Sequence, residues 1–243
     1  MNRPFIFFLT FISIILAPHP QLAALEWNGN ELVIANPQAG TPMHPVTAGD
    51  INADGKQEQI ILADHRATLM GESRTLWQTP PEWDVRQAEV TDLNRDHVPE
   101  VTLLLWRPFA PWLIDAMLPH GGRISSFQDQ ENRSCHIILI GWKRGAFREL
   151  WAGSPMAEPI LRFFPADWDG NGHQELLAVE GEYTRPEEAT AVTLWEWNGF
   201  GFTLSDRMRG ETNRAVLLNK PGGSPLLLLE LSKPVLPSRE VEP

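Results

Sequence analysis

Three short segments of this sequence carry side-chain oxygens at the same spacing. Each reads D-x-[DN]-x-[DN]-x-x-x-E, and the three acidic loops occupy residues 50–58, 92–100 and 167–175. Oxygens at positions 1, 3, 5 and 9 of a tight loop can all face one centre, and Ca²⁺ takes about six to eight oxygen ligands in a flexible cage. Mg²⁺ requires stricter octahedral geometry and keeps several waters. The spacing therefore predicts two or three calcium sites with a structural role.

Two other interpretations compete with calcium. An EF-hand needs Glu at position 12 of its loop, where this sequence has Ile61, Leu103 and Ala178, and it joins helices rather than strands. Solvated Asp and Asn turns are common between strands, but three such loops in register favour metal binding. The second loop departs from the pattern, because His97 stands at position 6, where the other two loops have glycine. Whether the second loop holds metal stays open.

Apolar runs next to the acidic loops predict β-strands. Each loop is followed at once by a short run rich in Val, Ile and Leu. A second element, a Trp followed within a few residues by Gly, recurs at Trp27, Trp142 and Trp197. The Asn-Gly pairs after Trp27 and Trp197 favour tight hairpins, because Asn and Gly tolerate positive φ. No segment shows a helical period, so the sequence predicts an all-β chain.

The predicted strands group into repeating four-stranded units. The N-terminal strand pair lacks an acidic loop and the C-terminal pair lacks a Trp-Gly hairpin, so joining them completes a unit and leaves no exposed sheet edge. The sequence thus predicts a small β-propeller of about four four-stranded blades, closed by pairing of the N- and C-terminal strands. The predicted blades cover residues 45–78, 85–151 and 158–206, and the fourth combines 25–35 with 214–218 and 225–231.

The second blade contains a long insert over residues 107–135, with several prolines and glycines. This insert is either a loop on one face or the strands of a fifth blade, and the loop is favoured. Trp106, Phe109 and Trp112 lie at its start, so this apolar stretch either forms an exposed contact surface or caps the open end of the ring. An exposed aromatic surface would stack on sugars or anchor a protein partner.

The acidic loops and the Trp-Gly hairpins together resemble the FG-GAP/VCBS repeats of integrin-α-like β-propellers, in their bacterial secreted form. The family loop, D-x-[DN]-x-[DN]-G-x-x-[DE] before an apolar strand, is matched by the first and third loops and, without the Gly, by the second. The family normally has seven blades and this chain is too short for seven, which leaves a small ring, an open sheet or an association of chains. The calcium ligands that the resemblance implies, with a backbone carbonyl at position 7, are Asp50, Asn52, Asp54, Lys56 and Glu58; Asp92, Asn94, Asp96, Val98 and Glu100; and Asp167, Asp169, Asn171, His173 and Glu175.

The first 24 residues have the layout of a secretory signal peptide. Arg3 supplies a positive start, residues 5–16 form an apolar run, and small residues precede a predicted cleavage point after Ala24. The run is shorter than the roughly 20 residues that span a bilayer, so no stable membrane insertion is expected after cleavage. The mature protein is expected to be secreted or periplasmic, with a propeller over residues 25–231 and a disordered tail over 232–243.

Composition restricts the class of function. Apolar residues make up 42% of the chain, which excludes disorder throughout. The formal net charge of -11 repels phosphate backbones and anionic lipid surfaces, so nucleic acid is not expected as a partner. Cys135 is the single cysteine, so neither an intramolecular disulfide nor a cysteine-based zinc site can form.

Known catalytic motifs do not accompany these features. The sequence has neither H-E-x-x-H nor G-x-S-x-G, it has no phosphate-binding glycine loop, and its histidines are scattered. We therefore favour a calcium-binding propeller that binds an extracellular protein or glycan without transforming it. The alternative is an extracellular hydrolase or lyase with an active site on the propeller loops.

Overall fold

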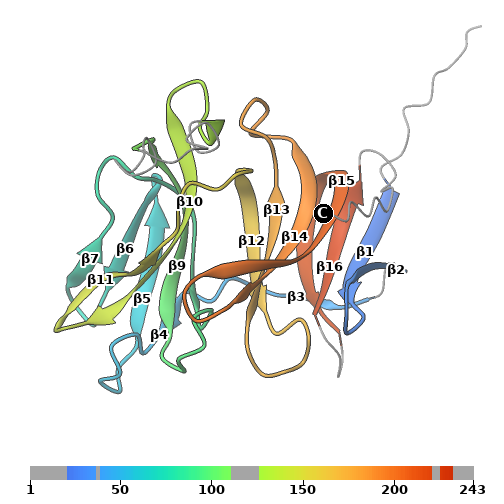
Figure 1. Cartoon of the computed structure of the whole chain (residues 1–243). Helices are drawn as coiled ribbons and strands as arrows, with labels where there is room; N and C mark the ends of the chain where they lie inside the picture. Colours follow the sequence, from blue (N-terminus) through green and yellow to red (C-terminus); the bar gives the residue numbers. More distant parts are fainter. Residues whose placement is uncertain (1–20, 37–38, 111–125, 221–224, 232–243) are drawn as a thin grey trace, which may run out of the picture.

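The computed structural model describes residues 21–36, 39–110, 126–220 and 225–231. These residues form antiparallel β-sheets joined by turns and loops, which confirms the predicted all-β class (Figure 1). Among them, no helix is long and apolar enough to cross a lipid bilayer. The apolar run of the predicted signal peptide and the predicted C-terminal tail lie outside the described residues.

The first two predicted units are four-stranded antiparallel sheets. The first sheet contains β4 (Ala48–Gly49), β5 (Glu58–Ala63), β6 (Arg66–Met70) and β7 (Thr75–Gln78), paired in chain order. The second contains β8 (Asp84–Thr91), β9 (Glu100–Pro108), β10 (Arg133–Lys143) and β11 (Ala146–Ala152), also in chain order. Short loops reverse the chain between most of these strands, and a longer connection does so between β9 and β10, so neighbouring strands pair antiparallel.

The insert of the second unit is shorter than predicted. β9 and β10 pair out to Pro108 and Arg133, so the connection between these strands covers only residues 109–132. Arg107 and Pro108 at one end of the predicted insert, and Arg133 and Ser134 at the other, pair with each other and extend the two strands. Residues 111–125, most of the segment that would distinguish a long loop from a fifth blade, lie outside the described part of the chain.

The third sheet combines the third predicted unit with both ends of the described chain. Its main path runs through β12 (Ile160–Ala166), β13 (Glu175–Glu180), β14 (Ala189–Trp197), β15 (Phe202–Asn219), β16 (Pro225–Leu231), β1 (Gln21–Trp27) and β2 (Leu32–Ala35). An eighth strand, β3 (Thr41–Pro42), pairs with β15 beside this path.

Strand β15 corrects the predicted end of the third unit at residue 206. Its first part pairs with β14 as far as Thr212, and the remainder pairs with β16. Register shifts interrupt both pairings, and one of them lies between Thr212 and Arg214. Such irregularities bend a strand and increase its twist, so one continuous strand serves two units that were predicted to be separate.

The two ends of the described chain pair with each other, as predicted. β1 lies antiparallel to β16, with Gln21 opposite Leu231 and Leu25 opposite Leu227. However, β1 begins four residues before the predicted domain start at residue 25, and Ala24 is fully buried. The predicted cleavage point therefore falls inside a strand. Small apolar residues suit both a cleavage site and a crowded strand face, and the sequence pattern alone did not separate the two.

Three apolar clusters hold the successive units together. The first includes Leu69 of the first sheet and Leu103 of the second. The second joins Ile137 of the second sheet to Phe163 of β12, and the third joins Trp168 to Leu227 of β16. Within the described residues, no apolar cluster joins the fourth unit to the first sheet, and the strands form no closed sheet. The predicted closed ring is therefore not observed.

The connection from β3 to β4 crosses between the fourth unit and the first sheet (Figure 1). The Met43 N–H donates a 2.9 Å hydrogen bond to the Leu217 carbonyl, and the Val90 N–H donates a 2.7 Å bond to the Val46 carbonyl. It borders a cavity of about 580 Å³ that β8 and β12 also line. Backbone hydrogen bonds thus connect this segment to β15 of the fourth unit and to β8 of the second sheet.

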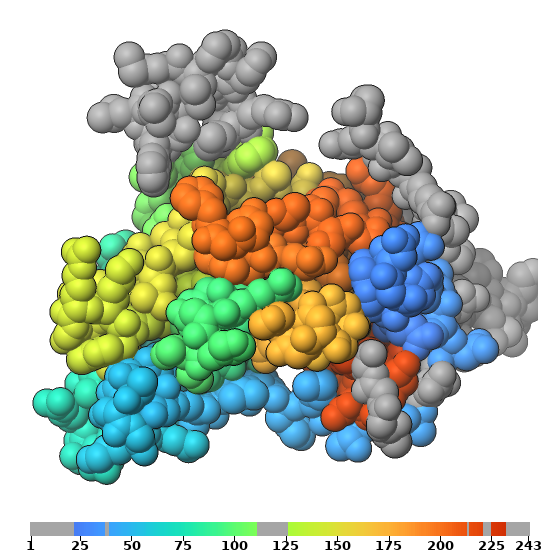
Figure 2. All heavy atoms as spheres, turned by 60° about the horizontal axis from the view of Figure 1, so that its bottom comes forward, coloured from blue at the N-terminus to red at the C-terminus, as the bar shows by residue number. Residues whose placement is uncertain are grey.

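All three acidic loops lie at the same end of their units. They join β4 to β5, β8 to β9 and β12 to β13, and the three turns lie together along the bottom of Figure 1. Figure 2 brings this face forward and shows the green second loop beside the yellow-orange third loop. The repeated topology therefore places the predicted metal ligands on one face.

Candidate functional site

The three acidic loops share one backbone conformation. In each loop the residues at positions 4 and 6 have positive φ, a region that L-residues other than Gly, Asn and Asp rarely enter. The φ values at position 4 are 59° at Ala53, 60° at Arg95 and 76° at Gly170, and those at position 6 are 85° at Gly55, 64° at His97 and 88° at Gly172. His97 therefore adopts the conformation of the glycines that it replaces.

The aspartate at position 1 organises each loop by accepting backbone N–H groups. Asp50 accepts the N–H of Asp54 at 3.0 Å and that of Gly55 at 2.9 Å. The equivalent aspartate Asp92 accepts two N–H groups of its own loop, at 3.1 and 3.3 Å, and Asp167 does so at 2.8 and 3.0 Å. Because the side chain replaces backbone partners within a turn, the D-x-[DN]-x-[DN] pattern itself specifies the loop shape.

The glutamate at position 9 begins the following strand and is buried in all three loops. Glu58, Glu100 and Glu175 are 3%, 0% and 1% exposed. One carboxylate oxygen of each accepts the N–H of the residue at position 2, at 2.9, 2.8 and 2.9 Å respectively. Each glutamate thus closes its loop onto the strand.

The second carboxylate oxygen has a different partner in each loop. In the first loop it accepts a 3.2 Å bond from the Asn52 amide. In the third loop, Glu175 Oε1 accepts a 2.8 Å bond from the Arg95 guanidinium. In the second loop, Glu100 Oε2 is buried and no described residue bonds to it. A buried carboxylate oxygen without a donor is destabilising, and a cation is the partner that would satisfy it.

Burial and neighbouring aspartates raise the pKa values of these glutamates. Burial, followed by repulsion from Asp92 and Asp96, raises the pKa of Glu100 to about 8. Burial and the aspartates of the third loop raise the pKa of Glu175 to about 7, against the lowering effect of Arg95. The pKa of Glu58 is also raised, chiefly by burial. The ionised form of each glutamate is therefore unfavourable in the metal-free loop, and a divalent cation beside it would favour ionisation.

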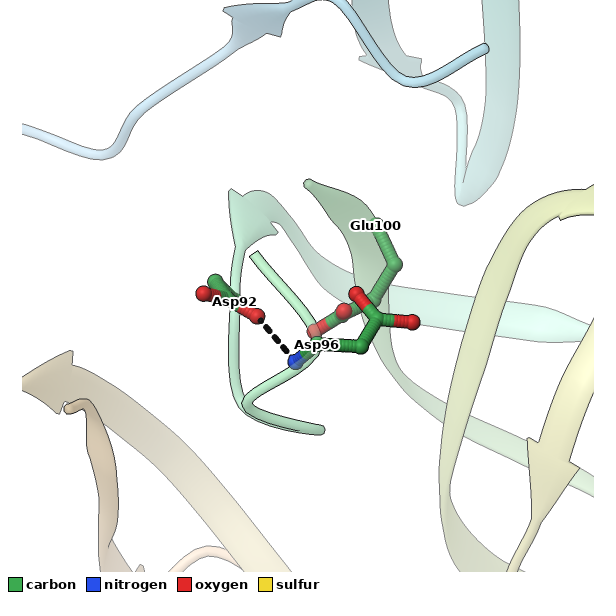
Figure 3. A group of neighbouring side chains, drawn as sticks. All are labelled: Asp92, Asp96 and Glu100. Atoms are coloured by element: carbon green, nitrogen blue, oxygen red, sulfur yellow. Dashed lines mark hydrogen bonds between the residues drawn. The ribbon is translucent and has the colours of Figure 1, made fainter. Parts of the chain in front are cut away.

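The second and third loops bring three carboxylates within reach of one ion. Oxygens of Asp92, Asp96 and Glu100 all lie within 4.8 Å of one another, and the same holds for Asp167, Asp169 and Glu175. Figure 3 shows the second loop, where the three side chains gather around the turn and the Asp96 N–H bonds to Asp92. The donor set consists of hard oxygens, which fits Ca²⁺.

The remaining predicted ligands lie in the same loops. The asparagines Asn52 and Asn94 and the aspartate Asp169, at position 3, accept the N–H of position 5 at 2.9, 3.1 and 3.0 Å. The position-5 side chains Asp54, Asp96 and Asn171 accept the N–H groups of Lys56, Val98 and His173 at 2.9, 2.9 and 2.7 Å. The role of the position-7 carbonyls as ligands stays a prediction.

The second and third loops contact each other directly, which the sequence did not indicate. Arg95 of the second loop forms its ion pair with Glu175 of the third, and the Asp92 N–H donates a 2.8 Å bond to the Gln174 side chain. The rings of His97 and His173 stack with centroids 5.9 Å apart. These residues are far apart in the chain, and no local pattern predicts their pairing.

Replacing His97 with Gly is expected to stabilise the metal-free protein by about 1 kcal/mol, since a histidine at positive φ carries backbone strain that Gly avoids. Urea unfolding in EDTA measures the change. The matched control is Gly172→Ala in the third loop, where a Cβ meets nothing within 4 Å but the φ is +88°. It should lose stability of similar size. A loss of stability in His97→Gly would contradict the shared loop conformation.

The exposed aromatic surface predicted at the start of the insert is not found at Trp106. This side chain is only 8% exposed and packs edge-on against Tyr183, with ring centroids 5.6 Å apart. Phe109 is half-buried, and its N–H bonds to the Asn132 carbonyl at 2.8 Å. Trp112 lies outside the described residues. Trp106 continues the alternation of β9, so its ring enters the core between the second and third sheets.

A cavity lined with aromatic side chains lies between the second sheet and the β14–β15 hairpin. Its volume is about 1140 Å³, and Trp83, Trp151, Trp195 and Phe202 contribute to its wall. Phe200, at the hairpin tip, also lines it and is 89% exposed. Polar residues that line the cavity include Arg107, Glu149, Ser154 and Asn198. Apolar walls with a few polar groups are typical of ligand sites.

One Ser–His contact borders this cavity. Ser134 Oγ lies 2.8 Å from His136 Nε2, and His136 Nδ1 lies 3.0 Å from the Gly153 carbonyl. Burial and the nearby Arg107 lower the pKa of His136 to about 4. A general base works best with a pKa near the operating pH, and Ser134 is fully buried. This pair therefore serves the fold rather than nucleophilic catalysis.

Comparisons with known proteins show only weak similarity. No protein-family model and no curated protein matches the chain. A chain in the crystal structure of BBS1N in complex with ARL6DN is similar, with 11% identity and a TM-score of 0.26. The match covers 77% of this chain and 65% of that one, so this chain spans less than two thirds of its length.

Proposed function

We propose that this chain is an exported, calcium-binding β-propeller of the FG-GAP/VCBS type that binds a ligand without transforming it. The observation that carries the calcium assignment is the repetition of one loop conformation. Three loops share two positive-φ positions, the N–H bonds to the first aspartate and a buried closing glutamate. Ordinary surface turns have no need for a buried carboxylate at a fixed ninth position.

The residues of the second loop fit a resident Ca²⁺ well. Glu100 has a buried oxygen without a described partner, and Asp92 and Asp96 offer oxygens beside it. When bound, the ion would supply charge neutralisation and tie the loop to the strand that follows it. The chain's own contribution is to position the oxygens through backbone N–H bonds. The role is structural, because the loops join strands that form the core between units.

Four stacked four-stranded units support a propeller of four blades, with the long strand β15 shared between the last two. Each unit packs on the next through an apolar cluster, as propeller blades do. Propellers host many unrelated functions, so the ligand must be argued from a site.

The aromatic cavity is the ligand site that we propose, in place of the predicted surface around Trp106. A sugar ring has an apolar face that stacks on an indole and a hydroxyl edge that needs donors and acceptors. Trp151 and Trp195 offer the aromatic groups, and Arg107 and Glu149 offer the polar ones. A glycan is therefore the first ligand class to test, with an extracellular protein as the second.

Loss of the exposed ring at the hairpin tip should weaken glycan binding. The labelled full chain is applied to an oligosaccharide microarray in calcium, and its Phe200→Ala and Trp195→Ala variants are tested beside it. Aromatic anchors at binding sites contribute about 1–2 kcal/mol or more, so binding should fall roughly tenfold or more. The control is Trp142→Ala, because Trp142 is 43% exposed and does not line the cavity.

Binding that survives both cavity variants, or that is lost equally in Trp142→Ala, would contradict the assignment of this cavity. Hydrolysis of an array glycan would favour the alternative, an extracellular hydrolase or lyase with its active site on the propeller loops. The Ser134–His136 pair does not favour that alternative, for the reasons of burial and low pKa given above.

A further inference from the structure

The three closing glutamates differ in the partner of their second carboxylate oxygen. Each uses one carboxylate oxygen to accept the N–H at position 2. The remaining oxygen, which is the one available to a metal, is unpartnered on Glu100 but carries an arginine on Glu175. This arginine is Arg95, which belongs to the neighbouring second loop. A positive charge of the chain itself therefore occupies the oxygen that a metal in the third loop would need.

We propose that Arg95 is a built-in competitor of Ca²⁺ in the third loop, so that the second loop is the tighter site and the third loop fills only when Arg95 is displaced. This inference rests on the proposed calcium function of the loops. The second and third loops then differ in their affinity for calcium although their sequence patterns match.

Charge supports the difference between the loops. Both loops hold three carboxylates within 4.8 Å of one another. The guanidinium of Arg95 lies 2.8 Å from Glu175, a residue that is 1% exposed, so the ion pair is largely withdrawn from water. Among the described residues, no lysine or arginine makes such a contact with Glu100. Calcium therefore meets an uncompensated charge cluster in the second loop and a partly compensated one in the third.

Arg95 is also poorly held, which makes its displacement feasible. Its Nε is buried without a described hydrogen-bond partner, and the residue itself has a φ of 60°. An unsatisfied buried donor and a left-handed backbone both raise the free energy of the arrangement. The Arg95 side chain is 21% exposed, whereas that of Glu175 is 1% exposed. Release of the Arg95 guanidinium into water would remove the first of these costs.

The Asp92 N–H bond to Gln174 links the same two loops through a second contact. This bond joins position 1 of the second loop to the residue before Glu175. A change in the third loop on metal binding would therefore reach the first ligand of the second loop. We expect the two sites to influence each other, whereas the first loop, which has neither contact, should titrate independently.

The test is a calcium titration of the full chain and of its Arg95→Gln variant, measured by isothermal titration calorimetry. Terbium(III) luminescence, excited through tryptophan, assigns the third loop, because Trp168 occupies its second position, where the other loops have Ile51 and Leu93. Glu175→Gln and Trp168→Phe verify that assignment, the first by removing the ligand and the second by removing the sensitiser. We expect Arg95→Gln to raise the affinity of the third loop at least about tenfold, and Arg95→Lys to raise it less.

A matched arginine elsewhere controls for the loss of a buried ion pair. Arg207 lies 2.7 Å from Glu180, which is 1% exposed, and its Nε is likewise buried without a described partner. Arg207→Gln removes a comparable pair away from the acidic loops and should leave the affinity of the third loop unchanged. Circular dichroism confirms that each variant is folded before titration.

The outcomes separate the two proposals. If calcium binds and the third loop has the same or lower affinity in Arg95→Gln, the competition by Arg95 is overturned while the calcium function stands. If neither the natural protein nor any variant binds calcium or terbium, the calcium function itself fails. A rise in affinity in both Arg95→Gln and Arg207→Gln would also overturn the inference, because it would reflect charge or stability in general.

Discussion

Calcium at about 1 mM is expected to raise the midpoint of thermal unfolding by about 10 °C over its value in excess EDTA. A site with a dissociation constant near 10⁻⁴ M contributes roughly 1.4 kcal/mol at that concentration, and two or three sites contribute about 3–4 kcal/mol. In a chain of this length each kcal/mol shifts the midpoint by about 2–4 °C. The physical reason is the crowding of two aspartates around one buried glutamate in the second and third loops, which the ion relieves. Differential scanning calorimetry measures the shift.

Magnesium at the same concentration is the control for charge screening and should shift the midpoint much less. Glu100→Gln keeps the shape of the side chain, should stabilise the metal-free protein, and should remove roughly one third to one half of the calcium effect, since it abolishes one of two or three sites. Equal shifts with both ions would indicate non-specific screening. The absence of any shift would reduce the loops to ordinary Asp and Asn turns and would remove the main support for the FG-GAP/VCBS proposal.

Replacing Trp168 with Ala is expected to destabilise the protein by about 3–5 kcal/mol, the usual cost of truncating a large buried aromatic residue. The Trp168 side chain is fully buried in the cluster between the third and fourth units, and the backbone N–H of this residue donates to Glu175. The substitution leaves a cavity at the point where the third loop meets the core. Thermal unfolding in calcium should show a midpoint lower by about 10 °C.

Trp142→Ala provides the matched control, because the Trp142 side chain is 43% exposed and packs against Phe147 at the surface. This variant should change stability by less than about 1 kcal/mol. Trp168→Phe keeps part of the volume and should fall between the two. Equal effects of Trp168→Ala and Trp142→Ala would contradict the location of Trp168 in the core between units.

Local patterns in the sequence predicted the loops well because the forces that shape them are local. Asp50, Asp92 and Asp167 accept backbone N–H groups only a few residues away, so a nine-residue pattern is enough to specify the turn. The same reasoning identified the strands that follow the loops, from their short continuous apolar runs. It also predicted that β1 and β16 would pair, because each terminal strand pair lacked what the other supplied.

Contacts between distant segments could not be predicted in that way. Trp106 continues the alternation of β9, yet whether its ring meets solvent or a neighbouring sheet depends on where Tyr183 lies, and the two residues belong to different units. The cavity behind Phe200 forms from several strands whose separation along the chain hides their proximity. The extension of β15 through two units likewise depends on which strands are available on each side of it.

The sequence by itself determined an all-β chain of antiparallel strands and three acidic loops of one conformation, because each of these follows from interactions over a few residues. Only the tertiary structure decided that the described strands form no closed sheet, that residues 21–24 belong to a strand and that the second and third loops touch. The Arg95–Glu175 pair shows the reason. Two loops with the same pattern acquire different electrostatic surroundings when packing brings a residue of one into the other, and packing is set by the whole chain.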